Sequence, residues 1–350
     1  MAQKKRPDAG FAQLKKDLAA GELGNLYLFH GEEDYLRDYY LGAIRKKLLP
    51  EGAEVFNLHT FQGKDLNLQE LSDCVDALPM MNERTVVIVY DFDLFRNEER
   101  RNRLEELFQD LPDYLCLIFV YDILPYKSGG NTRLGKLVKK VGCVVDFQPQ
   151  RQSDLNGWIR RHFRALGKEI DNTTAEYLTF LCGGLMTGLG SEIQKIGTYA
   201  SGPTVTRADV DAVATPVLDA KVFTMSDAIA AGQFDQAMGV LSELYQMNEP
   251  PIRILAALGT QLRQMWSARL ALEQKRGQGY LVDLWKLRTG WQARKLLDSA
   301  RQFDLSWCRD AVAMAAETDL AMKSAGRDPE ELLVELVLKL AASRQGVRGC

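Results

Sequence analysis

The sequence predicts a parallel α/β domain at the amino-terminal end of the chain, followed by all-helical domains. Up to residue 148, short apolar runs alternate with stretches of helical periodicity, which is typical of a mostly parallel sheet covered by helices. After Gln148-Pro149 the strand-like runs stop, and capping residues and apolar stripes of helical spacing follow. A chain of 350 residues is also too long for one ordinary core.

Five apolar runs are the candidate strands of the first domain. The third and fourth are continuous, as expected of strands buried on both faces of a sheet. In chain order, the candidates are Leu26–Phe29, Val55–Phe61, Thr85–Tyr90, Leu115–Val120 and Gly142–Phe147. A helix is expected between the second and third runs, with Leu78 in its buried stripe and Pro79 at its end.

Two helical domains are expected after this first domain, which covers residues 1–148. Residues 149–216 predict a small bundle, in which Thr206 and Asp209 have the spacing of a capping box, and the glycines between 183 and 190 are expected to form a loop. Residues 217–343 predict a third domain, with 344–350 as a tail. Its candidate helices cover 224–231, 233–246, 251–273, 291–302, 306–323 and 329–341.

The composition excludes several classes of protein. Hydrophobic residues make up 46% and charged residues 26%, the balance of a globular protein. The net charge of −3 excludes a histone-like coat, so any nucleic-acid contact must come from a local patch. The six cysteines include no CxxC pair and the three histidines are far apart, so no metal site is expected. No signal sequence or apolar run of membrane-spanning length is present, and the cytoplasm is the expected location.

A phosphate-binding loop is missing after the first candidate strand. A parallel α/β domain followed by a small helical domain is the layout of many ATPases, whose first strand runs into GxxxxGK[ST]. Here the strand runs into His30–Arg37, which holds one glycine, no lysine, and no serine or threonine. Three carboxylates, at 32–34, stand where a triphosphate needs positive charge, and one like-charge pair at about 4 Å costs on the order of 1 kcal/mol even in water. Nucleotide binding by the usual route is therefore disfavoured.

Other polar patterns have a structural and a functional interpretation. Asp91 and Asp93 follow the third candidate strand either as a polar strand end or as magnesium ligands, and the absence of a loop lysine favours the first. The basic clusters Arg45–Lys47, Arg133–Lys140 and Arg160-Arg161 are interpreted as solvated faces.

Six segments spread along nearly the whole chain match one known family in order and spacing. They are Tyr27–Leu36, Leu78–Val87, Gly190–Tyr199, Val222–Ile229, Pro250–Leu255 and the stretch from Asp319 through Leu340. Each is weakly specific alone, but together they resemble the bacterial DNA polymerase III delta subunit, a component of the clamp loader. The resemblance implies an AAA+-like first domain without a working ATP site, a small lid-type helical domain and a helical collar for oligomerisation.

The resemblance also implies a function and a set of partners. It suggests a non-hydrolysing subunit, without catalytic residues of its own, that binds and opens the sliding clamp (the beta subunit) for loading on primed DNA within a DNA polymerase holoenzyme. ATP is expected to be bound by the partner subunits, gamma/tau and delta-prime, so no cofactor is expected in this chain. The location implied is the replisome at the nucleoid.

Met80 and Met81 are the sharpest candidate contact. In the family, two bulky apolar residues at this place enter a pocket on the clamp, so the resemblance assigns clamp binding to Leu78, Pro79, Met80 and Met81. Methionine suits such a contact because it is unbranched, polarizable and adaptable. The alternative is that both methionines pack beneath the strand that begins at Thr85.

A second candidate contact lies in the third domain. Trp291 is surrounded by Arg288, Arg294 and Lys295, and an aromatic ring among cations can stack on a base and pair with phosphate. The family associates a tryptophan near this position with the primer–template junction. The alternative is that Trp291 is a core residue beside a solvated basic face. The last turn between helices, Lys323–Arg327, lacks the aromatic residue that the family can carry there.

Two rival functions remain open on the sequence alone. One is an active ATPase with an atypical nucleotide site, and the other is a clamp-loader-like adaptor in DNA repair. Nucleotide binding by the isolated chain would favour the ATPase over a delta-like subunit. Reconstitution with the loader ATPase subunits on primed DNA distinguishes the repair adaptor from a delta-like subunit.

Overall fold

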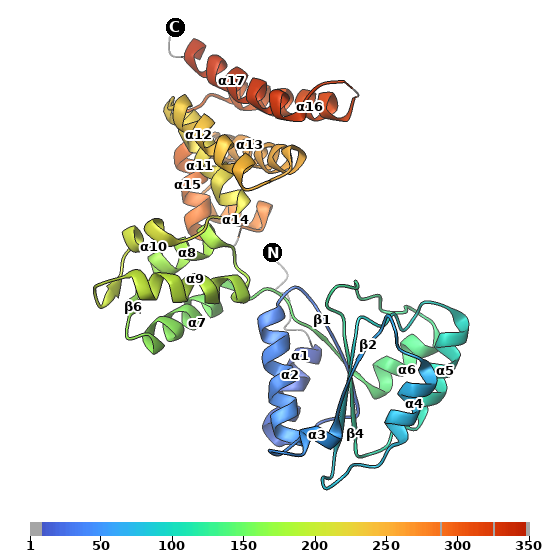
Figure 1. Cartoon of the computed structure of the whole chain (residues 1–350). Coiled ribbons are helices and arrows are strands. Elements are labelled where there is room, and N and C mark those ends of the chain that lie inside the picture. The colour runs from blue at the N-terminus through green and yellow to red at the C-terminus, as the bar shows by residue number, and fades with distance from the viewer. Residues whose placement is uncertain (1–8, 288, 325, 348–350) are drawn as a thin grey trace. The chain divides into compact units, whose positions relative to one another are not determined.

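A computed structural model describes residues 9–287, 289–324 and 326–347 of the chain (Figure 1). The chain divides into two compact units between Gln150 and Arg151, and the short segment Leu185–Thr187 groups with the first unit. The second predicted boundary, at 216/217, stays a prediction because both helical parts group in one unit. No helix within the described ranges is long and apolar enough to cross a membrane.

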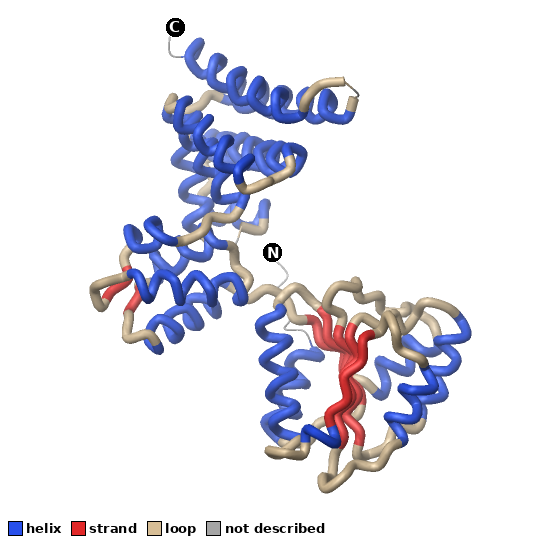
Figure 2. Tube along the Cα trace, in the orientation of Figure 1, coloured by secondary structure: helices blue, strands red, loops and turns tan. Residues whose placement is uncertain are grey.

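The first unit is a five-stranded parallel sheet with helices on both faces (Figures 1 and 2). The strand order is β2-β3-β4-β1-β5, and every neighbouring pair is parallel. The strands are β1 (Leu26–His30), β2 (Leu58–Gln62), β3 (Thr85–Tyr90), β4 (Leu115–Val120) and β5 (Cys143–Asp146). The helices are α1 (Ala9–Ala20), α2 (Asp34–Leu48), α3 (Glu54–Asn57), α4 (Leu68–Asp76), α5 (Glu98–Gln109) and α6 (Arg133–Val141).

The sheet carries a hydrophobic core on each face, which explains the continuous apolar runs of its strands. Leu26 and Leu28 of β1 join the core under α4, α5 and α6. Tyr27 and Phe29, which alternate with them, join the core under α1 and α2. Because side chains alternate between faces along a strand, a strand covered on both faces has no polar positions left.

The parallel arrangement also sorts the loops between two edges of the sheet. The amino ends of the strands meet at one edge, which lies at the bottom of the first unit in Figure 1, near α3. The loop of residues 77–84, which leads into β3, lies at this amino edge. The segment that follows β1, where ATPases hold phosphate, lies at the opposite, carboxyl edge.

The second unit is helical apart from one short pair of strands, β6 (Glu169–Ile170) and β7 (Thr204–Val205). One hydrophobic core runs through the helices from α11 onward. The helices are α7 (Gln152–Ala165), α8 (Asn172–Cys182), α9 (Met186–Tyr199), α10 (Arg207–Val213), α11 (Leu218–Ala231), α12 (Phe234–Gln246), α13 (Pro251–Glu273), α14 (Gln278–Trp285), α15 (Gly290–Ala300), α16 (Leu305–Lys323) and α17 (Pro329–Val347).

Some sequence predictions are confirmed and others are wrong. The capping box at Thr206 is present, with the Thr206 hydroxyl and the Asp209 carboxylate each bonded to the other's backbone. The glycine loop is wrong in part, since Gly188 and Gly190 lie inside α9. The small domain also contains the β6–β7 pair, and α14 was missed; β6 and β7 have only two residues each, too few for a periodic signal.

Two errors fall near the amino edge of the sheet. Residues 55–57, predicted as the start of a strand, belong to the one-turn helix α3, and β2 begins only at Leu58. Leu78 was assigned to a buried helical stripe, but α4 ends at Asp76 and Ala77 is extended. The helical spacing therefore stops before Leu78, whose side chain is exposed.

Candidate functional site

Three apolar side chains project from the loop of residues 77–84 at the amino edge of the sheet. Leu78 is 75% exposed, Met80 55% and Met81 96%, and we refer to these three residues as the apolar tip. Pro79, between them, is partly buried. Large apolar side chains exposed next to one another usually mark a contact surface for another molecule. The structure thus places the two methionines outside the core rather than beneath β3.

The backbone of Met80 is fixed by a buried asparagine from α3. The Asn57 side chain accepts a hydrogen bond from the Met80 N–H at 2.7 Å and donates one to the Met80 carbonyl at 2.8 Å. It also donates to the carbonyl of Ala53 at 2.9 Å, and Asn57 has no exposed surface. Both backbone groups of Met80 are therefore paired by one side chain, as in a strand pair.

The residues after Met80 are also held in one conformation. Met81 has φ of +53°, a left-handed conformation that costs an L-residue about 1–2 kcal/mol. The Asn82 side-chain amide donates to the carbonyls of Leu48 at 3.1 Å and Arg84 at 2.6 Å. The Arg84 guanidinium donates in turn to the carbonyl of Leu115, at 3.2 Å. These bonds tie the loop to α2 and to the start of β4.

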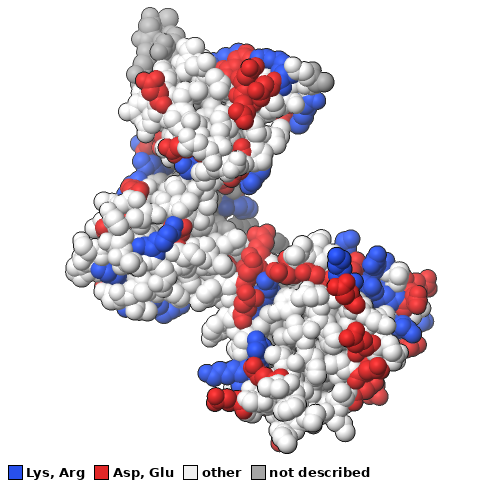
Figure 3. Space-filling model, in the orientation of Figure 1, with Lys and Arg blue, Asp and Glu red and all other residues white. Residues whose placement is uncertain are grey.

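Two more apolar side chains are exposed on α3, directly beside Asn57. Val55 is 79% exposed and Phe56 is 51% exposed. In Figure 3, uncharged atoms make up most of the lowest part of the first unit, while a few acidic and basic side chains lie at its lower left, near the place of α3 in Figure 1. No pattern in the sequence singled out α3, because Val55 and Phe56 favour a strand locally.

At the carboxyl edge, the segment after β1 packs tightly against the end of β5. Gly31 has φ of +120°, and a Cβ atom at this position would lie 2.4 Å from the carbonyl oxygen of Phe147. The Glu33 N–H donates to the same carbonyl at 2.9 Å. The Glu33 side chain is buried, and its carboxylate accepts a hydrogen bond from the Met186 N–H at 3.0 Å. The segment after β1 therefore packs against the backbone of Phe147 and Met186, and its Glu33 carboxylate is buried there.

Arg37 collects the acidic side chains of this edge into one cluster. Its guanidinium lies 2.8 Å from the carboxylate of Asp34, 3.5 Å from that of Asp38 and 2.7 Å from that of Asp122, and its side chain is 6% exposed. The cluster joins the first turns of α2 to the loop after β4. The cation needed near these carboxylates is thus supplied by the chain itself.

Asp91 uses its carboxylate to shape the neighbouring loop. One of its oxygens accepts hydrogen bonds from the N–H groups of Asp122, Ile123 and Leu124, at 3.0, 2.9 and 2.8 Å. Asp93 likewise accepts from the Phe95 N–H at 3.0 Å. This geometry agrees with the interpretation of these aspartates as a polar strand end.

The second candidate contact, on α15, has a different environment. The Trp291 ring is partly buried and packs against Phe180 at a centroid distance of 4.6 Å and Tyr177 at 5.5 Å. Arg294 is exposed and Lys295 partly so, with its Nζ 6.0 Å from the Trp291 ring centroid. Arg288 lies outside the described residues. The packing favours a core role for the tryptophan, while the cations of α15 stay accessible.

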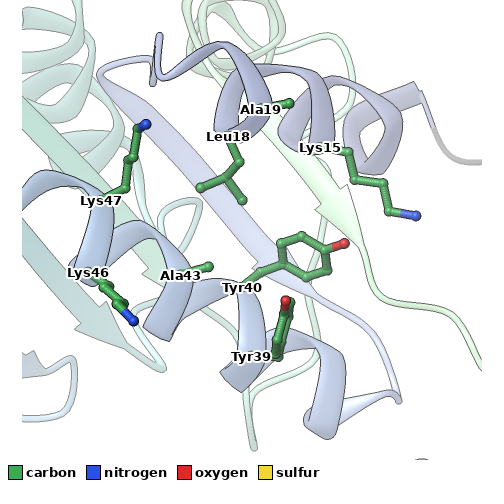
Figure 4. Close-up of a pocket in the computed structure, with 8 residues that line it drawn as sticks. All are labelled: Lys15, Leu18, Ala19, Tyr39, Tyr40, Ala43, Lys46 and Lys47. Carbon is green, nitrogen blue, oxygen red and sulfur yellow. The ribbon is translucent and has the colours of Figure 1, made fainter. Parts of the chain in front are cut away.

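A shallow groove of about 540 Å³ lies between α1 and α2 of the first unit (Figure 4). In Figure 4, Lys15 lies at one end of the groove and Lys46 and Lys47 lie at the other, with Tyr39 and Tyr40 between them. Its lining contains no acidic residue, and the three lysines form no ion pair with another described residue. The three lysines therefore make the groove a positively charged surface.

Comparisons with known proteins agree on one family. The DNA polymerase III delta subunit family model matches residues 27–148, and the model of its C-terminal domain matches residues 219–340. DNA polymerase III subunit delta of Bacillus subtilis is 25% identical over 329 residues, covering 92% of this chain and 94% of that protein. A probable DNA polymerase III subunit delta of Aquifex aeolicus is 23% identical over 259 residues, covering 71% of this chain and 72% of that protein.

A solved structure shares the fold. The Bacillus subtilis DNA clamp loader delta protein superposes with a TM-score of 0.51 at 23% identity, covering 95% of this chain and 99% of that chain. The family models thus point to a clamp-loader component, whose first unit is here a parallel five-stranded sheet. The chain belongs to the DNA polymerase III delta subunit family, and its role lies in clamp loading.

Proposed function

We propose that this chain binds the sliding clamp through the apolar tip and helps to open it for loading on primed DNA. The observation that carries the proposal is the exposure of Met80 and Met81 on a loop whose backbone is fixed on both sides. The tip lies at the amino edge of the sheet, away from the edge where related ATPases handle nucleotide.

The apolar tip can supply a useful binding free energy. Inserting two methionine side chains into an apolar pocket contributes roughly 3–5 kcal/mol before ordering costs. Because the loop backbone is already fixed, only the flexible side chains lose freedom on binding. Binding shifts the clamp toward the conformation that fits the rigid first unit best. This binding opens the clamp only if the opened conformation is the one that fits best.

We further propose that this chain holds no nucleotide, and that the gamma/tau and delta-prime subunits of the loader bind the ATP. Three observations support this proposal. Gly31 packs against Phe147, the Glu33 carboxylate is buried, and Arg37 holds the neighbouring carboxylates in a cluster. A triphosphate there would have to displace backbone contacts and lie beside carboxylates. The rival function, an ATPase with an atypical site, requires the segment to open.

Calorimetry with the purified full-length chain tests both parts. Titration of the clamp into the chain should give saturable binding without nucleotide, and titration of ATP with magnesium should give no heat of binding. Absence of clamp binding would contradict the first part. Micromolar ATP binding would contradict the second and support the rival ATPase. A repair adaptor is distinguished by reconstitution, because only a loader subunit should restore clamp loading on primed DNA.

A further inference from the structure

We infer that the clamp contact has two parts, the apolar tip and the exposed face of α3, and that Asn57 is the positioning residue that joins them. This inference rests on the proposed function. It adds Val55 and Phe56 to the contact and assigns a role to a side chain that the clamp itself never touches. The partner chemistry is an apolar depression on the clamp that is wider than two methionine side chains.

The side chain of Asn57 fixes the backbone of Met80 through hydrogen bonds. Its carboxamide forms three bonds: Oδ1 accepts from the Met80 N–H, and Nδ2 donates to the carbonyls of Met80 and Ala53. The residue is fully buried, so these bonds are formed away from solvent. Without them, the N–H and the carbonyl of Met80 both lose their partner, and the loop is free to sample other conformations.

Asn57 also connects α3 with the loop of residues 77–84. Residues 54–57 form a single helical turn, and the turn that directs Asn57 inward leaves Val55 and Phe56 exposed. Asn57 binds Met80 directly, although 23 positions separate them in the sequence. The two exposed apolar pairs, Val55-Phe56 and Met80-Met81, therefore flank one buried hydrogen-bonded joint. The hydrogen bonds of Asn57 hold α3 and the Met80 backbone next to each other, so the inferred contact treats the two pairs as one surface.

The chemistry of Asn57 excludes a simple replacement. Aspartate has the same shape and keeps the acceptor for the Met80 N–H, but it cannot donate to the Met80 carbonyl or the Ala53 carbonyl. Alanine removes all three bonds. If Asn57 acts on clamp binding through the loop, both substitutions should weaken it even though neither removes a contact with the clamp.

A double-mutant cycle on the full-length chain tests the positioning role. Clamp affinity is measured by calorimetry for wild type, Asn57→Ala, Met81→Ala and the double variant, with Asn57→Asp as a second probe and thermal unfolding as the control for folding. We expect Asn57→Ala to weaken binding by on the order of tenfold in the wild-type background. We expect a clearly smaller effect when Met81 is already alanine, because the two residues act through one contact.

Phe56→Ala tests the α3 part separately. We expect a several-fold loss of clamp affinity with only a small fall in the melting temperature, because about half of the ring is exposed. Tyr39→Ala, which removes an exposed aromatic ring from α2 of the same unit, is the matched control and should bind as wild type.

The outcomes separate the inference from the proposed function. If Met81→Ala weakens binding while both Asn57 variants and Phe56→Ala bind within about twofold of wild type, the inference is overturned and the proposed function stands. If Asn57→Ala weakens binding equally in both backgrounds, its effect is a general loss of structure and the positioning role is overturned. If Met81→Ala and Met80→Ala both bind as wild type, the proposed function fails and the inference with it.

Discussion

The side-chain amide of Asn57 pairs with both backbone groups of Met80, at 2.7 and 2.8 Å, in the way that a neighbouring strand would. These two hydrogen bonds hold the backbone of an exposed loop in one conformation, as a neighbouring strand does at the edge of a sheet. It lets Met80 and Met81 remain in solvent without a flexible backbone, so that little conformational entropy is lost when a partner covers them.

Replacing Met81 by glycine should separate clamp binding from stability. Met81→Gly removes the exposed side chain and at the same time relieves the left-handed strain at φ +53°. We expect the free energy of unfolding to stay within about 1 kcal/mol of wild type while clamp affinity falls. Chemical denaturation and calorimetry on the same preparation measure the two quantities. Wild-type affinity in this variant would show that the Met81 side chain makes no contact.

Removing Arg37 should destabilise the first unit. Arg37→Gln leaves the carboxylates of Asp34, Asp38 and Asp122 close together without their shared cation. We expect a loss of about 2–3 kcal/mol in the free energy of unfolding, measured by denaturant titration. Arg301→Gln, which breaks the exposed ion pair with Asp298, is the control and should leave stability nearly unchanged. Equal effects of the two substitutions would contradict the role of the Arg37 cluster.

The stability of the second unit should depend on the charge of Asp227. Burial raises the pKa of this carboxyl, which accepts a hydrogen bond from the Ser299 hydroxyl at 2.5 Å. A raised folded-state pKa means that the protonated form is favoured in the fold, so this contribution is full below the unfolded pKa of about 4 and is lost as the pH rises through the folded pKa. Asp227→Asn keeps an acceptor for Ser299 and should raise the melting temperature at pH 7. The gain should shrink toward pH 4, and a variant that is less stable at pH 7 would contradict this assignment.

The cations of α15 remain the predicted DNA contact. Substituting Arg294 and Lys295 together by glutamine should weaken binding to primed DNA and reduce the slope of log K against log salt by about one to two. The melting temperature should fall only slightly, since Lys295 also stabilises the charge of the partly buried Asp227. The matched control replaces Lys46 and Lys47 in the α1–α2 groove, and it should leave DNA binding unchanged. The reverse result would move the DNA contact to the groove. Trp291→Ala should mainly lower the melting temperature, because the ring packs on Phe180 and Tyr177.

The sequence was informative where one physical signal dominates. Continuous apolar runs placed β3 and β4, and Pro251 placed the start of α13 correctly. The residues 55–57 were misassigned because Val-Phe favours a strand locally, whereas the buried amide of Asn57 binds Met80 and ends α3. That partner is distant in sequence, so no local pattern could reveal it.

The candidate contacts show the same limit. The place of Met80 and Met81 followed from sequence resemblance, but their exposure depends on where α4 ends, and helix ends are poorly defined by periodicity alone. Trp291 looked like a stacking platform because its neighbours in sequence are cations. Its neighbours in space include Tyr177 and Phe180, from a helix more than a hundred residues earlier in the chain.

Clamp affinity of the variant Met80→Ala/Met81→Ala tests the central claim most directly. The control is Ile123→Ala, which removes an equally exposed apolar side chain, 88% accessible, from the opposite edge of the same sheet. Calorimetric titration of the sliding clamp should show that the double variant has lost on the order of 2–3 kcal/mol of binding free energy, while the control binds as wild type and both remain folded. Clamp binding by the double variant that matches wild type would contradict the assignment of the apolar tip as the clamp contact.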